Sequence, residues 1–270
     1  MNRWTLSLPM RREGFDDPGF VREAAQAAEA AGCWGITAPD HIVAPNKWAR
    51  AGGGERWPDP FVLLGFIAGV TTTLRLITHI IVLPYRHPLA VAKAIASLDR
   101  LSDGRAVLGV GSGYLREEFE ILGADFENRG RVTDEAIRTI RSCWTEGDIP
   151  GFDARLAPQP VQAGGPPVWI GGNSLRALRR AVELGDCWAP FDVTDEQLRT
   201  GIARAEQLGR RVEIAAPLGR VQPTDGVEAV RARLEQLQAI GVDIIKIALG
   251  GDTGEEWLTN FAWFADALGR

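Results

Sequence analysis

The chain has 270 residues, a formal net charge of -5 and a composition that is 45% apolar and 24% charged. These values are typical of an ordinary globular protein. Acidic residues outnumber basic ones and no dense run of Lys or Arg occurs, which argues against a nucleic-acid groove and against a membrane-surface helix. We therefore expect a small-molecule partner, with no nucleic acid and no membrane.

The amino terminus lacks the pattern of a secretory signal, and no apolar run is long enough to cross a bilayer. Cys33, Cys143 and Cys187 are widely spaced, so they predict neither a disulfide framework nor a thiolate zinc site. The three histidines form no metal-binding motif, and we expect no metal. Reduced thiols in a cytoplasmic protein fit this pattern best.

Eight short apolar runs alternate with helix-like segments along the whole chain. They span residues 4–9, 35–38, 74–83, 105–110, 167–170, 187–190, 212–217 and 244–249. Their hydrophobicity is continuous rather than alternating, which is typical of parallel strands buried on both faces. Eight such alternations favour a closed α/β barrel, the (β/α)8 TIM barrel, over an open doubly wound sheet. No change in composition marks a boundary, so we expect a single TIM-barrel domain over residues 1–270.

Capping residues mark the helices between these runs. Asp17 and Asp59 each precede a proline, as an N-cap precedes the first helical position. The first helix has small apolar residues at spacings of three and four and is expected to stop at Gly32. Thr194 and Gln197 have the spacing of a capping box.

Two connections are longer than usual, residues 41–58 and residues 145–166. The first leaves the carboxyl end of the second strand and contains Gly52, Gly53 and Gly54. Barrel enzymes keep their chemistry at that end, so residues 41–58 are predicted to form a lid. We expect both segments to close the barrel mouth.

Polar side chains interrupt the apolar pattern near strand ends. Asp40 and His41 follow the second strand, where an imidazole can act as a general acid or base; the alternative is an N-cap beside a surface histidine. His79 lies inside an otherwise apolar strand. It is either a buried histidine with a satisfied hydrogen bond or a side chain placed in the mouth beside a cofactor. His87 precedes Pro88 at a helix start and is expected to be structural.

Two glycine-rich turns follow later strands. The turn over residues 109–113 lets backbone approach a flat ring or a phosphate, although it fits neither the dinucleotide fingerprint nor the nucleophile elbow. The turn over residues 171–174 precedes a helix whose positive end could hold a phosphate; the alternative is a plain turn. Arg176, Arg179 and Arg180 on that helix could add charge for an anionic tail, but we expect them to form a solvated basic face.

Together these segments resemble the luciferase-like monooxygenase superfamily, in its short F420-dependent oxidoreductase branch. The resemblance is carried by residues 38–41, 74–88, 92–105, 109–119, 129–135, 167–174 and 185–188. It implies a (β/α)8 barrel that binds coenzyme F420 at the carboxyl ends of the strands, with FMN as the alternative cofactor. Because relatives are commonly dimers, it also implies a homodimer.

The resemblance implies hydride transfer between C5 of the deazaflavin and a small organic substrate. His41 would exchange the coupled proton, with His79 or Tyr114 as a substitute, and relatives have a cis peptide bond behind the ring that maps to His79-Ile80. The expected ring contacts and phosphate-side contacts are Asp40, His41, Thr78, His79 and Ile80, then Gly111, Ser112, Gly113, Tyr114, Gly171, Gly172, Asn173 and Ser174.

The sequence departs from the family pattern at three positions. His79 stands where this branch commonly has a small residue. Sugar-phosphate dehydrogenases of the superfamily use a Trp and a Glu where this chain has Pro45 and Tyr114, which disfavours that substrate. The open alternatives are an FMN-dependent luciferase-like monooxygenase, a non-catalytic deazaflavin-binding protein, and a phosphate-binding barrel hydrolase or isomerase.

Overall fold

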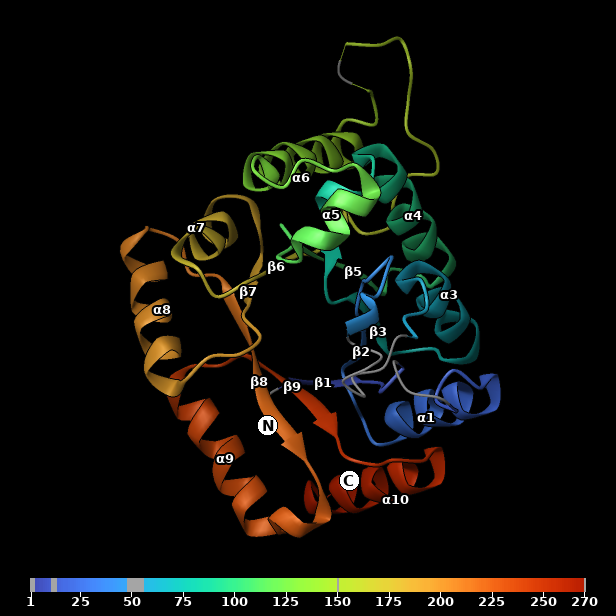
Figure 1. Ribbon diagram of the computed structural model, residues 1–270, viewed down its shortest axis with the longest axis vertical. Coiled ribbons are helices and arrows are strands. Elements are labelled where there is room, and N and C mark those ends of the chain that lie inside the picture. The colour runs from blue at the N-terminus through green and yellow to red at the C-terminus, as the bar shows by residue number, and fades with distance from the viewer. Residues whose placement is uncertain (1–2, 11–13, 48–55, 150, 270) are drawn as a thin grey trace.

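The computed structural model describes residues 3–10, 14–47, 56–149 and 151–269 (Figure 1). Its strands are β1 (Arg3–Ser7), β2 (Gly35–Ala38), β3 (Arg75–Thr78), β4 (Ile81–Val82), β5 (Ala106–Gly111), β6 (Val168–Gly171), β7 (Cys187–Ala189), β8 (Glu213–Val221) and β9 (Ile244–Leu249). Its α-helices are α1 (Pro18–Ala30), α3 (Pro60–Val70), α4 (Pro88–Leu101), α5 (Arg116–Leu122), α6 (Arg129–Thr145), α7 (Leu175–Leu184), α8 (Asp195–Gln207), α9 (Val227–Ile240) and α10 (Gly254–Ala267).

The strands form one parallel sheet in the order β3-β2-β1-β9-β8-β7-β6-β5-β4, and a further pairing of β3 with β5 closes it. Because β3 and β4 are two parts of the third barrel strand, the closed barrel has eight strands, and the predicted (β/α)8 architecture is confirmed. The helices surround this barrel (Figure 1). None of the described helices is both long enough and apolar enough to cross a membrane.

The predicted helix ends are confirmed by their hydrogen bonds. Asp17 accepts from the Phe20 N–H at 3.0 Å, and Asp59 accepts from the first N–H groups of α3. The capping box at the start of α8 makes both of its bonds. Gly32 follows α1 with a φ of +70°, a conformation that favours glycine. His87 caps α4 by accepting from the Leu89 N–H, so its structural role is also confirmed.

The third strand differs from the uninterrupted run predicted over residues 74–83. It stops at Thr78 and resumes at Ile81, and the His79-Ile80 peptide bond between the two parts is cis, as the resemblance implied. A Cβ on Gly109 would lie 1.9 Å from the Thr78 carbonyl oxygen, and one on Gly111 would lie 2.0 Å from Ile80 Cδ1. Glycine on β5 therefore makes room for the irregular segment, a requirement that the apolar pattern of the third strand does not reveal.

The two long connections lie at different ends of the barrel. The second extends outward beyond α6 and then enters the amino end of β6, with Gln162 donating to the Ala106 carbonyl at the start of β5 (Figure 1). The expectation that residues 145–166 close the mouth is therefore wrong, because a connection from a helix to a strand returns to the opposite end. Of the predicted lid, residues 48–55, including Gly52, Gly53 and Gly54, lie outside the described residues.

Two apolar clusters fill the molecule. The larger lies between the sheet and the helices, and the smaller lies inside the barrel, where Trp34 stacks on Trp169 with 5.9 Å between ring centroids and 5° between planes. Arg3 lies over Trp34 and pairs with Glu213 at the amino ends of the strands. The lower part of the barrel is thus filled, as barrel interiors usually are, and open space remains toward the carboxyl ends.

Candidate active site

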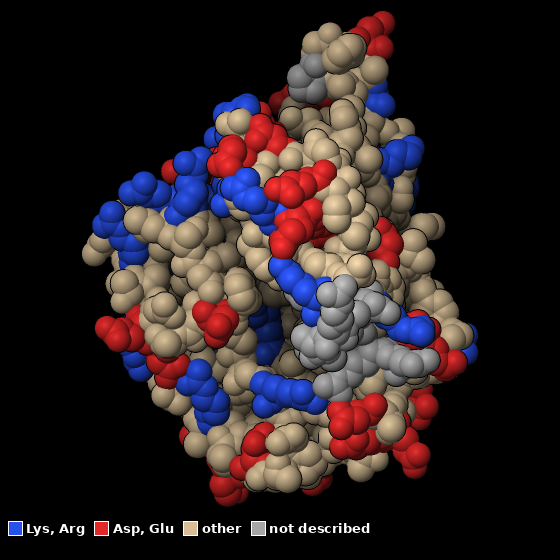
Figure 2. Space-filling view, in the orientation of Figure 1, with Lys and Arg blue, Asp and Glu red and all other residues tan. Residues whose placement is uncertain are grey.

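A cavity of about 380 Å³ opens at the carboxyl ends of the strands, and we call it the glycine-walled cavity. That volume lies in the range of small-molecule sites. In Figure 2 the surface is hollowed at the centre of the barrel, with basic side-chain atoms inside the hollow. The cavity is lined by Pro39, Asp40, His41, His79, Ile80, Val82, Ser112, Gly113, Tyr114, Gly171, Gly172, Asn173, Ser174, Ala189 and Phe191.

Two of the expected cofactor contacts are not in this lining. Thr78 is fully buried and exchanges hydrogen bonds of 2.8 and 2.9 Å with the backbone of Gly109. Gly111 packs against Ile80, which itself lines the cavity. Both residues therefore shape the wall from behind, and the other expected contacts come together around one space.

His41 is held by a buried carboxylate on α5. Its Nδ1 lies 3.0 Å from Glu118 Oε2, and Glu118 is completely buried. The other carboxylate oxygen accepts the N–H groups of Ile42 and Val43 at 2.7 and 3.1 Å, and the Tyr85 hydroxyl donates to Glu118 at 3.1 Å. With Glu118 ionised, His41 carries a proton on Nδ1, which leaves Nε2 as the atom that exchanges a second proton.

The electrostatics of Glu118 favour its ionised form. Burial raises the pKa of this carboxyl, but hydrogen bonds from His41 and from the backbone of the following residues outweigh burial and hold the pKa below its usual value. The sequence carries a signal for Glu118, although the sequence pattern was not enough to predict its role. Glu118 lies on the same helical face as Leu115, Phe119 and Leu122, where an apolar residue is expected.

Asp40 lines the cavity, but its carboxylate is already bound. It forms a buried ion pair with Arg86, whose Nη2 lies 2.8 Å from Oδ1, and it accepts the Val82 N–H at 3.1 Å. Burial raises the pKa of Asp40, while Arg86 acts in the opposite direction. Asp40 thus joins the end of β2 to β4 and fixes the wall of the cavity.

Tyr114 lies at the rim and is 67% exposed. Its ring meets His41 edge-on, with 6.3 Å between centroids. Partial desolvation raises the pKa of Tyr114, and the Glu118 charge adds to that effect. Tyr114 can cover the cavity, whereas His41 has the better arrangement for proton exchange.

The far side of the cavity ends at the amino terminus of α7. Ser174 caps this helix by accepting from the Ala177 N–H, and Asn173 ties the turn to Phe191 and Asp192 after β7. Gly172 has a φ of +117° and presents no Cβ to the cavity. Backbone N–H groups at the positive end of a helix suit the phosphate of a nucleotide-like cofactor.

Two of the three arginines of α7 are paired with α6 and not with this end. Arg176 and Arg180 both pair with Asp134 on α6, and Arg180 also donates to the Gly130 carbonyl. Arg176 and Arg179 are exposed, whereas Arg180 is buried. The expected solvated basic face is therefore wrong for Arg180, whose ion pair joins α6 to α7.

A second cavity, of about 290 Å³, adjoins the first. The two share Pro39 and His79 in their walls. The lining of the second cavity is mostly apolar, with the hydroxyls of Ser7 and Thr37 2.6 Å apart. Its lining residues are Ser7, Leu8, Pro9, Met10, Thr37, Pro39, Trp57, His79, Arg220, Ala248, Leu249 and Gly251.

His79 has a partner that the sequence analysis missed. Lys246 Nζ lies 3.1 Å from His79 Nε2 and donates to the Pro190 carbonyl at 2.5 Å. The expected hydrogen bond of His79 is therefore confirmed, and its side chain also lines the barrel mouth; its place beside a cofactor stays a prediction. The signal was available, because Lys246 is the one charged residue in the apolar run Ile244 to Leu249.

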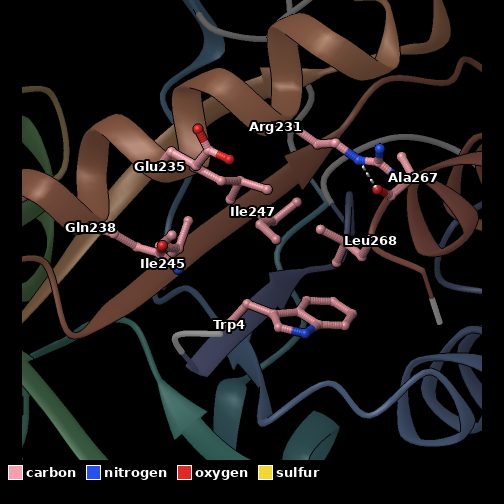
Figure 3. Close-up of a pocket in the computed structure, with 9 residues that line it drawn as sticks. Trp4, Arg231, Glu235, Gln238, Ile245, Ile247, Ala267 and Leu268 are labelled. Carbon is pink, nitrogen blue, oxygen red and sulfur yellow. Dashed lines mark hydrogen bonds between the residues drawn. The ribbon is translucent and has the colours of Figure 1, made fainter.

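Another cavity, of about 310 Å³, lies outside the barrel between α9, β9 and β1 (Figure 3). Ile245 and Ile247 line it, and they alternate along β9 with the inward-facing Ile244 and Lys246. Arg231, at its edge, donates to the Ala267 carbonyl at 2.8 Å. Most of its walls are aliphatic or aromatic, with Arg231, Glu235 and Gln238 on the side of α9.

Comparison with known proteins agrees with this geometry. The chain is 33% identical over 281 aligned residues to an uncharacterized protein of Mycobacterium tuberculosis, covering 94% of this chain and 96% of the relative. It is 30% identical over 177 residues to an FMNH2-dependent dimethylsulfone monooxygenase of Pseudomonas fluorescens, covering 62% of this chain and 46% of that enzyme.

A solved F420-dependent secondary alcohol dehydrogenase, in complex with an F420-acetone adduct, has the same fold. It superposes with a TM-score of 0.77 at 16% identity, covering 98% of both chains. The sequence profile of the luciferase-like monooxygenase family matches residues 5–256. The chain therefore belongs to the luciferase-like monooxygenase family.

Proposed function

We propose that the protein is an F420-dependent oxidoreductase that transfers a hydride between C5 of the deazaflavin and a small organic substrate. The observation that carries this proposal is the position of the His41–Glu118 pair, which opens on a cavity walled by glycine and ending at a helix amino terminus. A flat ring with an anionic tail fits such a space, because glycine backbone allows close approach and the helix end attracts phosphate.

The residues of this chain divide the work of binding and proton exchange. Gly172, Asn173 and Ser174 would hold the phosphate of the tail, and His79 and Ile80 would lie against the ring. When bound, the deazaflavin would supply or accept the hydride at C5. His41 would hold or release the coupled proton at Nε2, while Glu118 fixes its tautomer.

We choose F420 on the resemblance of residues 38–41, 74–88 and 109–119 to the F420-dependent branch. The similar proteins include both cofactors, with an F420-dependent secondary alcohol dehydrogenase of the same fold and an FMNH2-dependent relative at 30% identity. That same relative favours a second candidate function, an FMN-dependent monooxygenase of the luciferase-like type.

Titration of the cofactor-free protein with F420 and with FMN separates the two candidates. We expect F420 to bind at least about tenfold more tightly, a difference of roughly 1.4 kcal/mol. Preferential binding of FMN would favour the monooxygenase, and binding of neither would remove the redox assignment. F420 binding without turnover over a panel of enones, ketones, alcohols and imines would favour a non-catalytic binding protein.

A pair of variants at Gly172 tests the phosphate end. Gly172→Ala and Gly172→Asp have the same unfavourable φ, so they differ mainly in the added charge. We expect Gly172→Asp to weaken cofactor binding about tenfold more than Gly172→Ala, because like charges repel. Riboflavin, which lacks the phosphate, is the control ligand, and equal loss in both variants would place the tail elsewhere.

A further inference from the structure

A lysine lies inside the barrel beneath the mouth. Side chains of β9 alternate, so Lys246 points inward with Ile244, while Ile245 and Ile247 pack on the helices. Lys246 is only 7% exposed. An ammonium group in such a position is costly unless something compensates its charge, and lysines are rarely buried without a partner.

The described surroundings of Lys246 contain no negative charge to compensate it. No carboxylate of the described residues lies within ion-pair distance of Nζ, and its hydrogen-bond partners there are His79 and the Pro190 carbonyl. The inward neighbours on β7 and β1 are Cys187 and Thr5, and on β8 the strand register places Pro217 beside Lys246. The Thr5 hydroxyl is buried and has no hydrogen-bond partner among the described residues.

This arrangement changes the ionisation of both groups in the same direction. Burial lowers the pKa of Lys246 to about 7. Burial also lowers the pKa of His79, and the adjacent lysine lowers it further. The Lys246 charge disfavours protonation of His79, and an anion placed beside the pair would favour the protonated form of Lys246.

The mouth therefore contains two histidines with opposite partners. His41 is hydrogen-bonded to the carboxylate of Glu118, and His79 is hydrogen-bonded to the amine of Lys246. Opposite environments assign different chemical roles to groups of the same type. His41 is suited to proton exchange, whereas His79 with Lys246 is suited to holding positive charge next to the second cavity.

The second cavity has the lining that such a charge requires. His79 is part of its wall, no carboxylate is among its described lining residues, and Arg220 adds another cation. Leu8, Met10 and Leu249 make most of the remaining surface apolar. The second cavity thus has mostly apolar walls with basic side chains at its inner end, and it adjoins the space assigned to the cofactor.

We propose that Lys246 and His79 form a cationic unit beneath the second cavity, and that this cavity takes apolar carbonyl compounds whose oxygen becomes negative beside that unit. This inference rests on the proposed function. The carbonyl carbon gains the hydride, and with it two electrons, while the π pair moves to oxygen. That oxygen then takes a proton, for which His41 in the wall of the adjoining glycine-walled cavity is the proposed donor, and the reduced cofactor is oxidised by two electrons.

Lysine labelling measures the charge of this unit directly. The sequence contains three lysines, Lys47, Lys93 and Lys246, so protein labelled at lysine Cε gives three NMR signals, and Lys246→Met identifies one of them. The probe is cyclohexanecarboxylate, an apolar ring with a fixed negative charge, and cyclohexylmethanol is its uncharged match. We expect the carboxylate to raise the titration midpoint of Lys246 by about one pH unit or more, and the alcohol to leave it unchanged.

Affinity and turnover complete the test. Lys246→Met should bind the carboxylate about tenfold more weakly than the unmodified protein, and Lys93→Met, which changes an exposed lysine, should bind it normally. With a carbonyl substrate, Lys246→Met should lower kcat more than it raises KM, and cofactor affinity should stay within about threefold. An unchanged Lys246 midpoint, or equal carboxylate affinity in both variants, would overturn the inference. Failure of turnover with every reduced cofactor, while the carboxylate still raises the midpoint, would instead refute the proposed function alone.

Discussion

Replacing Glu118 by Gln removes the negative charge that is hydrogen-bonded to His41 and leaves the size and shape of the side chain almost unchanged. The amide oxygen of Gln can still accept the N–H groups of Ile42 and Val43. The amide nitrogen then faces His41 Nδ1 and the Tyr85 hydroxyl, and it donates where a carboxylate accepted. His41 must therefore present an unprotonated Nδ1, which moves its proton to Nε2 and removes the carboxylate that stabilises the doubly protonated ring, the form that gives a proton to the reduced substrate.

The size of the effect follows from the bonds that change. A well-placed general acid or base contributes about 10²- to 10⁴-fold to rate, so Glu118→Gln should lower the hydride-transfer rate by at least about 10²-fold. Two charge-assisted bonds, each about 1.5–3 kcal/mol, are replaced by neutral bonds of about 1 kcal/mol. The variant should therefore lose roughly 1–4 kcal/mol of stability at neutral pH.

The stability difference depends on pH with a defined sign. Because the folded pKa of Glu118 is depressed, its contribution is present above the unfolded pKa of about 4.3 and is lost as pH falls through the lower folded value. The gap in unfolding free energy between the two proteins should therefore narrow in acid below about pH 4.

Single-turnover kinetics with reduced cofactor, and urea unfolding at several pH values, measure the two effects. Glu117→Gln is the matched control, because Glu117 is exposed and pairs with Lys47 on the surface. Near-normal hydride transfer in Glu118→Gln, or a loss no greater than that of Glu117→Gln, would show that the His41–Glu118 bond has no part in the chemistry.

Three further results are expected. His41→Asn should slow hydride transfer at least about 10²-fold while cofactor affinity changes less than about threefold, and parallel losses in a binding titration would make His41 a ring contact instead. Arg86→Met leaves the Asp40 carboxylate buried without its cation, so urea unfolding should show a loss of about 3–5 kcal/mol in the free energy of unfolding. Adding Asp40→Asn should recover part of that loss. No recovery would show that the ion pair is unimportant for stability. Gly109→Ala forces a Cβ toward the Thr78 carbonyl and should lower the free energy of unfolding by about 1–3 kcal/mol or more. Gly65→Ala in α3 places a Cβ with nothing within 4 Å and should raise the free energy of unfolding by about 0.5–1 kcal/mol. Similar values for both variants would contradict the packing argument.

The barrel was predictable because its signals are local. Continuous apolar runs gave the strands, and side-chain caps such as Asp17 and Thr194 gave the helix starts. The break between Thr78 and Ile81 was not visible in the apolar pattern, because what allows it is glycine on a different strand. The direction of the segment over residues 145–166 could have been predicted from the barrel topology itself.

The candidate site was predictable only where chemistry sits directly after a strand. Asp40, His41 and the turn at Gly172 follow strand ends, so their gathering in one cavity needed no knowledge of side-chain contacts. Glu118 and Lys246 act through contacts with residues 77 and 167 positions away in the sequence. In the sequence, each of them is visible only as a charged residue within an apolar pattern. That pattern marks the residue as unusual but does not predict which residue it contacts.

The stacked indoles of Trp34 and Trp169 fill the barrel on the amino-terminal side of the mouth, so ligands of the two cavities enter and leave at the carboxyl end of the strands. A molecule that enters the mouth leaves by the way it came. Where two ligands occupy the mouth together, the one bound deeper has to bind first and dissociate last. The two stacked indoles thereby determine the order in which the ligands bind and dissociate. Steady-state inhibition patterns can measure that order.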